Sequence, residues 1–330
     1  MIKNVNVNEL LFSDLLVKDA VNDVNSRLTG DDKRGKFILT GGRGSGKSTV
    51  LVNRENDGLK TKHPAVLVRF DGAGLFGTKD NDYFNKRIMG HYYEVLMCHK
   101  FLEHIKEFYP DLYFARFTRF EDLTRNRLYE IDNYINNALY KKVSIDHKLF
   151  SGEMLSEILS LFRQGTNAET VTLMIDRFDW THNSDPRVQD ILRNYFSMFE
   201  KVIVTSDDPT IMSDKKKKVA LEDRGFGFEV VDYGRDLDTV VEIVQRRFDL
   251  DSETHPKFPI DDLESEDYQE LIRRCDGNLE LMLNTFMYAE TLHKWDSKRD
   301  ASTILSDACC QRVKDEKQYR KMVKPPKFHV

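Results

Sequence analysis

Residues 36–49 read KFILTGGRGSGKST, and this stretch decides the fold. A short β-rich run leads into a glycine loop that matches G-x-x-x-x-G-K-[ST] at Gly41, Gly46, Lys47 and Ser48. Glycines allow positive φ and bring backbone N–H groups against phosphate oxygens. A helix that begins near Lys47 adds the positive end of its dipole. The stretch therefore predicts a phosphate-binding loop between a strand and a helix.

The chemistry of this loop suits a nucleoside triphosphate, and we expect ATP with Mg²⁺. Lys47 is expected to reach the β and γ phosphates, and the Ser48 hydroxyl to ligate the magnesium ion. The predicted nucleotide-binding residues are Gly41, Gly42, Arg43, Gly44, Ser45, Gly46, Lys47, Ser48 and Thr49.

A second motif, VTLMIDRFDW, carries a carboxylate at the end of an apolar run. Asp176 stands where a strand ending beside the phosphate loop would hold magnesium, directly or through water. Arg177 occupies the place where hydrolytic enzymes carry a glutamate that polarises the attacking water. Asp179 is the nearest other carboxylate. The sequence leaves two alternatives open: Asp179 acts as a displaced base, or hydrolysis is slow or absent.

Two further candidates for the catalytic site follow along the chain. KVIVTSDD predicts a strand ending at Thr205 and Ser206, where the Thr205 hydroxyl is expected to orient water or touch the γ-phosphate. Arg224, just before a fifth strand, is positioned to reach a nucleotide on a neighbouring subunit. A solvated helix-end arginine is an equal alternative for Arg224.

Five apolar runs alternate with helical segments, which is typical of a parallel sheet covered on both faces. The runs are Lys36–Thr40, Pro64–Gly72, Val171–Asp179, Lys201–Asp207 and Phe228–Tyr233. The fold class is therefore α/β, with a three-layer αβα arrangement around a five-stranded parallel sheet.

The chain is expected to divide into three parts. Residues 1–233 form the ATPase domain, which starts with a helix over about 8–28 and carries a large helical insertion at about 80–165. This insertion is rich in aromatic and basic residues, which favours either helix packing or a binding surface. Residues 234–295 form a helical lid, and residues 296–330 form a basic, partly disordered tail.

Composition bounds the partners and the location. With 40% hydrophobic and 32% charged residues and no apolar run near 18 residues, the chain is expected to be cytoplasmic or nucleoid-associated, without a membrane partner. The four cysteines lack zinc-binding spacing and are expected to be reduced thiols. The net charge of −5 excludes a wholly cationic surface, but basic residues cluster at Lys215, Lys216, Lys217 and Lys218 and again over 312–327.

Taken together, these motifs resemble the AAA+ ATPases and the related STAND class of P-loop NTPases, in their origin-recognition-complex-like and KAP-like branches. The resemblance covers about residues 8–290, and it implies the strand order 5-1-4-3-2 followed by a helical lid. Gly277 and Asn278 match the lid motif, whereas Glu280 stands in place of its arginine and Leu279 in place of the STAND proline.

These departures predict a slow ATPase that works as a nucleotide-controlled assembly switch and forms ATP-dependent oligomers with itself. The first functional hypothesis is a DNA-associated switch of the initiator, helicase-loader or transposition-regulator type, binding DNA through the two basic clusters. The alternative is a signal-transducing or antiviral-defence NTPase that acts through a protein effector. A small-molecule kinase is a third and weaker alternative.

Overall fold

The computed structural model describes residues 35–42, 44–59, 61–69, 86–138, 153–176, 195–206, 210–223, 225–250 and 258–322. The chain divides into two compact units. One contains the phosphate loop, Gly41–Val50, together with the chain from Val230 onward; the other contains the strands up to Glu229 and the helices between them. The expected helix over 8–28, and also Arg43, Arg177, Asp179 and Arg224, lie outside the residues described.

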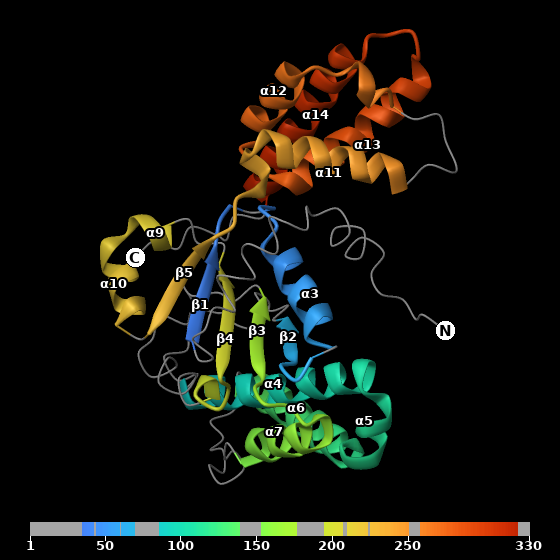
Figure 1. Ribbon diagram of the computed structural model, residues 1–330. Coiled ribbons are helices and arrows are strands. Elements are labelled where there is room, and N and C mark those ends of the chain that lie inside the picture. Colours follow the sequence, from blue (N-terminus) through green and yellow to red (C-terminus); the bar gives the residue numbers. More distant parts are fainter. Residues whose placement is uncertain are drawn as a thin grey trace. The chain divides into compact units, whose positions relative to one another are not determined.

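The five strands form one sheet in the order β2-β3-β4-β1-β5, shown side by side in Figure 1. Read from the other edge this is 5-1-4-3-2, so the expected order is confirmed. The pairings of β1 with β4, β4 with β3 and β3 with β2 are all parallel. The strands span β1 Gly35–Thr40, β2 Ala65–Arg69, β3 Thr172–Asp176, β4 Lys201–Ser206 and β5 Phe226–Val230.

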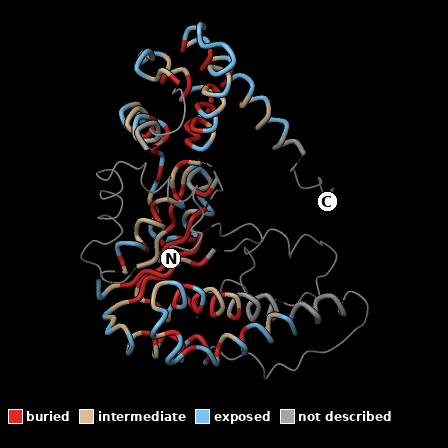
Figure 2. Tube along the Cα trace, turned by 90° about the vertical axis from the view of Figure 1, so that its right-hand side faces the viewer, coloured by how far each residue is buried: buried red, intermediate tan, exposed pale blue. Residues whose placement is uncertain are grey.

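The burial of the inner strands β3 and β4 explains why their sequence runs are nearly continuously apolar. Every residue of β3 and β4 is buried, so both faces of the sheet are covered there, as Figure 2 shows in red. Parallel strands covered on both faces have nearly continuous runs of apolar side chains. The αβα fold class is therefore confirmed, with β5 as a more exposed edge strand.

Between β2 and β3 the insertion forms a packed layer of helices. Helix α4 contacts β2 and also α5, α6 and α7. Its Phe101 packs edge-on against Phe162 of α7, with ring centroids 5.1 Å apart. Phe117 and Phe120 are buried in the same core, so these rings of the described part of the insertion serve helix packing. The bounds are α4 Lys86–Phe108, α5 Pro110–Arg116, α6 Thr118–Ala138 and α7 Glu153–Thr166.

A buried polar pair joins this layer to the helix that follows the phosphate loop. That helix is α3, Lys47–Gly58, which begins at the residue the sequence indicated. Glu55 of α3 contacts His104 Nδ1 of α4 at 2.9 Å through its Oε1 atom. The same oxygen accepts from the Leu67 N–H of β2 at 3.2 Å. Because an unpaired buried carboxylate is costly, these contacts fix the end of α3 against the sheet and α4.

Two short helices, α9 (Thr210–Ser213) and α10 (Lys215–Glu222), lie between β4 and β5. After β5 the chain is helical, beginning with the 3-10 turn η2 (Tyr233–Arg235). The lid then comprises α11 Leu237–Leu250, η3 Ile260–Asp262, α12 Ser265–Cys275, α13 Leu279–Trp295 and α14 Ala301–Met322. None of the helices in the described part of the chain has both the length and the apolar character needed to span a membrane.

Helix α14 differs from the expected partly disordered tail. It packs against α12 and α13, and it buries Ala301, Ile304, Leu305, Ala308 and Cys309. These residues recur at helical spacing and form one apolar face. The polar and basic composition of the segment conceals this face in the sequence, but residues 301–322 form a packed helix.

Candidate functional site

The phosphate loop has the backbone that its glycines were expected to allow. Gly44 and Gly46 have φ values of 73° and 101°, a region that other residues adopt only with strain. The Ser45 N–H donates to the Gly42 carbonyl at 3.2 Å, and the Val50 N–H to the Gly46 carbonyl at 3.1 Å. The loop is thus a tight turn that runs directly into the first turn of α3.

Lys47 lies at the start of α3 and its side chain is folded back over the loop. Its Nζ donates to the carbonyls of Gly41 at 3.0 Å and Gly42 at 2.8 Å, and the residue is only 6% exposed. The Ser45 hydroxyl is buried and makes no hydrogen bond within the described part of the chain. A buried hydroxyl without a partner is costly, and it fits a loop shaped to receive an oxygen-rich ligand. Ser48 is exposed, so its hydroxyl is accessible.

At the ends of β3 and β4 a carboxylate and a hydroxyl form a buried pair. Asp176 and Thr205 are each 2% exposed, and the Thr205 hydroxyl donates to Asp176 Oδ1 at 2.7 Å. Ile175 pairs with Val204, so the next residues of both strands meet at the same edge of the sheet. That Thr205 orients water or touches the γ-phosphate stays a prediction; in this structure its hydroxyl donates to Asp176.

The register of β1 brings the start of the phosphate loop to this same edge. Thr40, its last residue, pairs with Ser206 of β4, and Gly41 follows directly in the chain. The carboxyl ends of parallel strands are the usual location of ligand sites in open α/β sheets. The strand register therefore places Thr40, the last residue before the loop, and the Asp176–Thr205 pair at one edge of the sheet.

Residues that follow β5 in the chain contact the loop in ways that the motifs did not indicate. The Leu279 N–H, at the start of α13, donates to the Gly44 carbonyl at 3.1 Å. The ring of Tyr233 lies so close to Gly46 that a Cβ there would be 2.7 Å from it. Asn278 was singled out only as part of a lid motif, and no sequence signal pointed to Tyr233.

A small charged cluster stands beside these contacts. The Arg235 guanidinium bridges Asp232 and Asp276, with N–O distances of 3.2 Å to each. Burial raises the pKa of Asp232 above its ordinary value, and Asp276 adds to this, while Arg235 and Lys47 oppose it. The Lys47 charge therefore acts on the Asp232 carboxyl.

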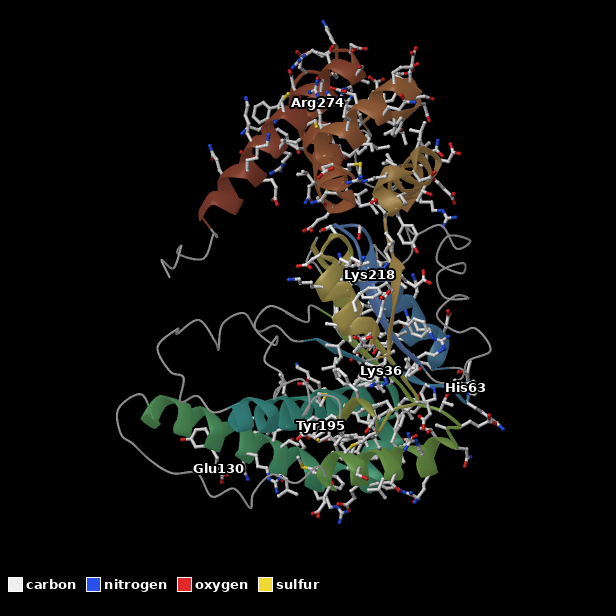
Figure 3. All side chains as sticks on the ribbon, turned by 90° about the vertical axis from the view of Figure 1, so that its left-hand side faces the viewer. Lys36, His63, Glu130, Tyr195, Lys218 and Arg274 are labelled. Carbon is white, nitrogen blue, oxygen red and sulfur yellow. The ribbon has the colours of Figure 1, made fainter. Side chains whose placement is uncertain are left out.

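The remaining predicted residues are distributed as follows. Glu280 is exposed in the first turn of α13. Lys215 and Lys216 are exposed on α10, where Lys218, labelled in Figure 3, pairs with Glu222 at 3.8 Å. On α14, Lys314 and Lys317 are exposed, while Arg312 stacks on Tyr288 with its guanidinium carbon 4.7 Å from the ring centroid. No group of three or more metal-ligating side chains occurs among the residues described.

Comparison with known proteins identifies distant structural similarity. No protein-family model and no curated protein matches the chain. Domain III of the replication initiation protein DnaA from Thermotoga maritima is similar at 12% identity and a TM-score of 0.44, covering 93% of this chain and 99% of that one. The ORC2 protein of Aeropyrum pernix is similar at 12% identity and a TM-score of 0.46, covering 94% of this chain and 69% of that one. PCH-2 of C. elegans is similar at 15% identity and a TM-score of 0.38, covering 94% of this chain and 69% of that one.

The fold assignment rests on the chain's own topology. The parallel sheet has the order 5-1-4-3-2, the glycine loop connects β1 to α3, and a helical lid follows β5. The chain therefore has the three-layer αβα fold of the P-loop NTPases.

Proposed function

We propose that this chain binds ATP with Mg²⁺ and acts as a slow ATPase whose nucleotide state controls assembly. The observation that carries the proposal is the loop itself. One segment, which opens a helix, combines positive-φ glycines, the Lys47 ammonium and the buried Ser45 hydroxyl, which has no partner among the residues described. Such a segment presents backbone N–H groups, a cation and a helix dipole to an anion.

Each residue of the proposed site has a distinct role. Lys47 would exchange its two loop carbonyls for phosphate oxygens, and the Ser48 hydroxyl and the Asp176 carboxylate would hold the metal. Thr205 orients Asp176 through the 2.7 Å hydrogen bond and occupies one of its lone pairs. Magnesium in such sites keeps several waters and takes one or two protein ligands, which agrees with so small a ligand set. When bound, the ion would neutralise charge that develops on the phosphates.

Slow turnover is inferred from two departures in the sequence. Arg177 follows Asp176 in the sequence where a glutamate would polarise water, and the exposed Glu280 replaces the lid arginine. A negative side chain cannot stabilise the negative charge of a phosphoryl transition state. The site can therefore hold a nucleotide for long periods, as an assembly switch requires. Asp179 and an Arg224 from a neighbouring subunit remain the candidates for base and trans-acting cation.

Nucleotide binding is tested by calorimetry with ATP on the wild type and on Lys47→Ala. We expect affinity to fall about 100-fold, because two charge-assisted contacts of roughly 1.5 kcal/mol each are lost. Lys62→Ala is the matched control, since Lys62 is a surface lysine paired only loosely with Glu169 at 3.4 Å. Equal affinities of the two variants, or no binding by the wild type, would contradict the proposal.

Hydrolysis is tested separately by phosphate release. We expect turnover well below about 10 s⁻¹, the middle of the range for ordinary enzymes. Asp176→Asn keeps an oxygen for Thr205 but removes the metal-binding charge, so turnover should fall further while the protein remains folded. A wild-type turnover above that value would exclude the slow switch.

For the partner we propose DNA, supported by the exposed Lys215 and Lys216 on α10 and Lys314 and Lys317 on α14. Binding to phosphates by lysines weakens steeply with salt. A fluorescent duplex should therefore bind at low ionic strength, and Lys215→Ala with Lys216→Ala should weaken it and reduce the salt slope. Absence of DNA binding at low salt would contradict a DNA partner and favour the alternative.

That alternative is a switch that acts through a protein effector. It is favoured by the contacts that already engage part of the basic charge, namely Lys218 with Glu222 and Arg312 with Asp315 and Tyr288. Co-purification of a protein with the ATP-bound form, lost in Lys47→Ala, would support it.

A further inference from the structure

The phosphate loop is held on two sides by residues that follow β5. All of these residues belong to the compact unit that contains Gly41–Val50 and the chain from Val230 onward. On one side the loop backbone meets Asn278 and Leu279 at the start of α13, and on the other it meets the ring of Tyr233. The contacts are polar or involve bare backbone, in contrast to ordinary apolar packing.

Asn278 makes two contacts with one side chain. Its Oδ1 accepts the Leu281 N–H at 3.0 Å and so caps α13. The same oxygen lies where a side chain on Gly44 would begin, since a Cβ there would be 2.0 Å from it. Asn278 is 6% exposed, so water does not readily replace either contact. The capping residue of α13 is thus packed directly on the phosphate loop.

The next residue extends the connection through the backbone. The first N–H groups of a helix have no partner inside the helix. In α13 the Leu279 N–H is satisfied by the Gly44 carbonyl at 3.1 Å. A change in the orientation of the Gly44 peptide therefore either breaks this bond or moves the first turn of α13 with it.

Tyr233 limits the freedom of the loop on the other side. Its ring is buried and lies against Gly46, where a Cβ would meet the ring at 2.7 Å. Gly44 and Gly46 flank Ser45, whose buried hydroxyl has no partner in the described chain. The loop thus cannot rearrange around a bound phosphate without altering at least one of the two contacts.

We propose that Asn278 is a positioning residue that transmits the state of the phosphate loop to helix α13. This rests on the proposed nucleotide binding of the loop. The position where a lid arginine would read the γ-phosphate carries the exposed Glu280, so the lid has no such cation there. In this chain the lid instead responds to the loop backbone, through the Gly44 carbonyl and the Asn278 side chain.

The first experiment needs no nucleotide and tests the contact itself. Thermal unfolding is compared for the wild type, Gly44→Ala, Asn278→Ala and the double variant. Gly44→Ala introduces the clash and also strains a positive-φ position, and removal of the Asn278 side chain relieves only the clash. Residues in contact do not act additively. We expect the Tm loss caused by Gly44→Ala to be about 2–4 °C smaller in the Asn278→Ala background. Additive losses would overturn the contact.

The second experiment tests transmission, by hydrogen–deuterium exchange of peptides from α13 with and without Mg·ATP. In the wild type we expect the nucleotide to change exchange in the first turns of α13 at least about twofold. Asn278→Ala should abolish this difference while nucleotide affinity stays within about tenfold of the wild type. An unchanged difference in Asn278→Ala, or none in a wild type that binds Mg·ATP, would overturn the proposal.

Two controls separate this effect from simple loss of a cap. Asp236→Ala removes the cap of α11, where Asp236 accepts the Thr239 N–H at 2.8 Å, and it should leave the response of α13 intact. Asn278→Ser keeps an acceptor for the cap but is too short to fill the space beside Gly44, so it should behave like Asn278→Ala. Absence of Mg·ATP binding by the wild type would overturn the proposed function and the transmission together. The comparison of Tm values among the single and double variants would still test the contact between Gly44 and Asn278.

Discussion

The phosphate loop and the helical insertion are both densely packed, yet by opposite means. Around the loop, bare glycine backbone meets an amide side chain, a tyrosine ring and helix N–H groups. In the insertion, rings pack on rings, with Phe162 of α7 between Phe101 and Tyr109 at centroid distances of 5.1 and 5.3 Å. Hydrophobic burial is strong and non-directional, whereas backbone contacts are weak and geometrically specific.

The difference separates stability from function. Loss of an apolar contact in the insertion should lower the free energy of unfolding and leave ligand binding nearly unchanged. Loss of a contact at the loop should change ligand binding as well as stability. The aromatic content of the insertion is thus explained mainly by packing, and the polar contacts around the loop are where nucleotide chemistry is proposed.

The largest effect on stability is expected from Phe162→Ala. The side chain is fully buried and its removal leaves a cavity, so unfolding free energy should fall by about 3–5 kcal/mol. Nucleotide affinity of the folded fraction should stay within about threefold of the wild type. Urea unfolding and calorimetry measure the two quantities, and a large affinity loss would remove the contrast between the regions.

Gly46→Ala should lower ATP affinity as well as stability. The new methyl group meets the Tyr233 ring and the backbone φ of 101° becomes strained, so stability should fall by about 1–3 kcal/mol. ATP affinity should fall more than tenfold, because the loop can no longer present its N–H groups. Gly225→Ala, at a φ of 81° with open space around it, is the control for strain alone. An equal affinity loss in both variants would contradict the assignment.

A smaller, pH-dependent effect is expected at the bidentate pair between Arg163 and Glu200. Arg163 contacts both Glu200 oxygens at 2.8 and 2.9 Å, and the Val171 N–H adds a bond at 2.9 Å. Burial alone would raise the pKa of Glu200, but these hydrogen bonds and the Arg163 charge outweigh it and lower the pKa below its ordinary value. A lowered folded-state pKa stabilises the protein above the unfolded pKa, and that stabilisation is lost as pH falls through the folded value.

Arg163→Met should therefore destabilise the protein by about 1–2 kcal/mol at neutral pH, since the pair is partly exposed. The difference from the wild type should shrink as the pH falls below about 4.5, the ordinary value for glutamate. Urea titrations at several pH values measure it, and a difference that does not change with pH would show that charge is not the cause.

The smallest effect is expected from the exposed aromatic residues of the insertion. Phe114 and Tyr129 are 65% and 67% exposed. Replacing either by alanine should change the free energy of unfolding by less than about 0.5 kcal/mol. Loss of partner binding in these variants, without loss of stability, would revive the reading of the insertion as a binding surface.

Much of the fold could be predicted because its signals are local. The runs that became β1 and β4 were recognised within one residue at each end, and the run that became β3 within one residue at its start, since inner parallel strands are largely apolar. The fifth strand was placed two residues late, because an edge strand is only partly buried. Helix α14 was mistaken for a tail because its apolar face, including Ile304 and Ala308, lies within a basic and polar segment.

The candidate site was predicted unevenly for the same reason. The conformation of the loop depends on its own glycines, and Gly44 and Gly46 have the positive φ that the motif requires. Asp176 was placed correctly at a strand end, but its bond with Thr205 depends on the register of two strands. Register is decided by packing across the whole sheet.

The sequence by itself determined the phosphate loop, the strand that feeds it and the helix that begins at Lys47, because backbone freedom and apolar periodicity are properties of neighbouring residues. Only the tertiary structure decided that Thr205 supports Asp176 and that Asn278 and Tyr233 enclose the loop. Gly44 and Asn278 lie more than 200 positions apart in the chain. Their contact depends on how whole elements pack, and no local pattern encodes it.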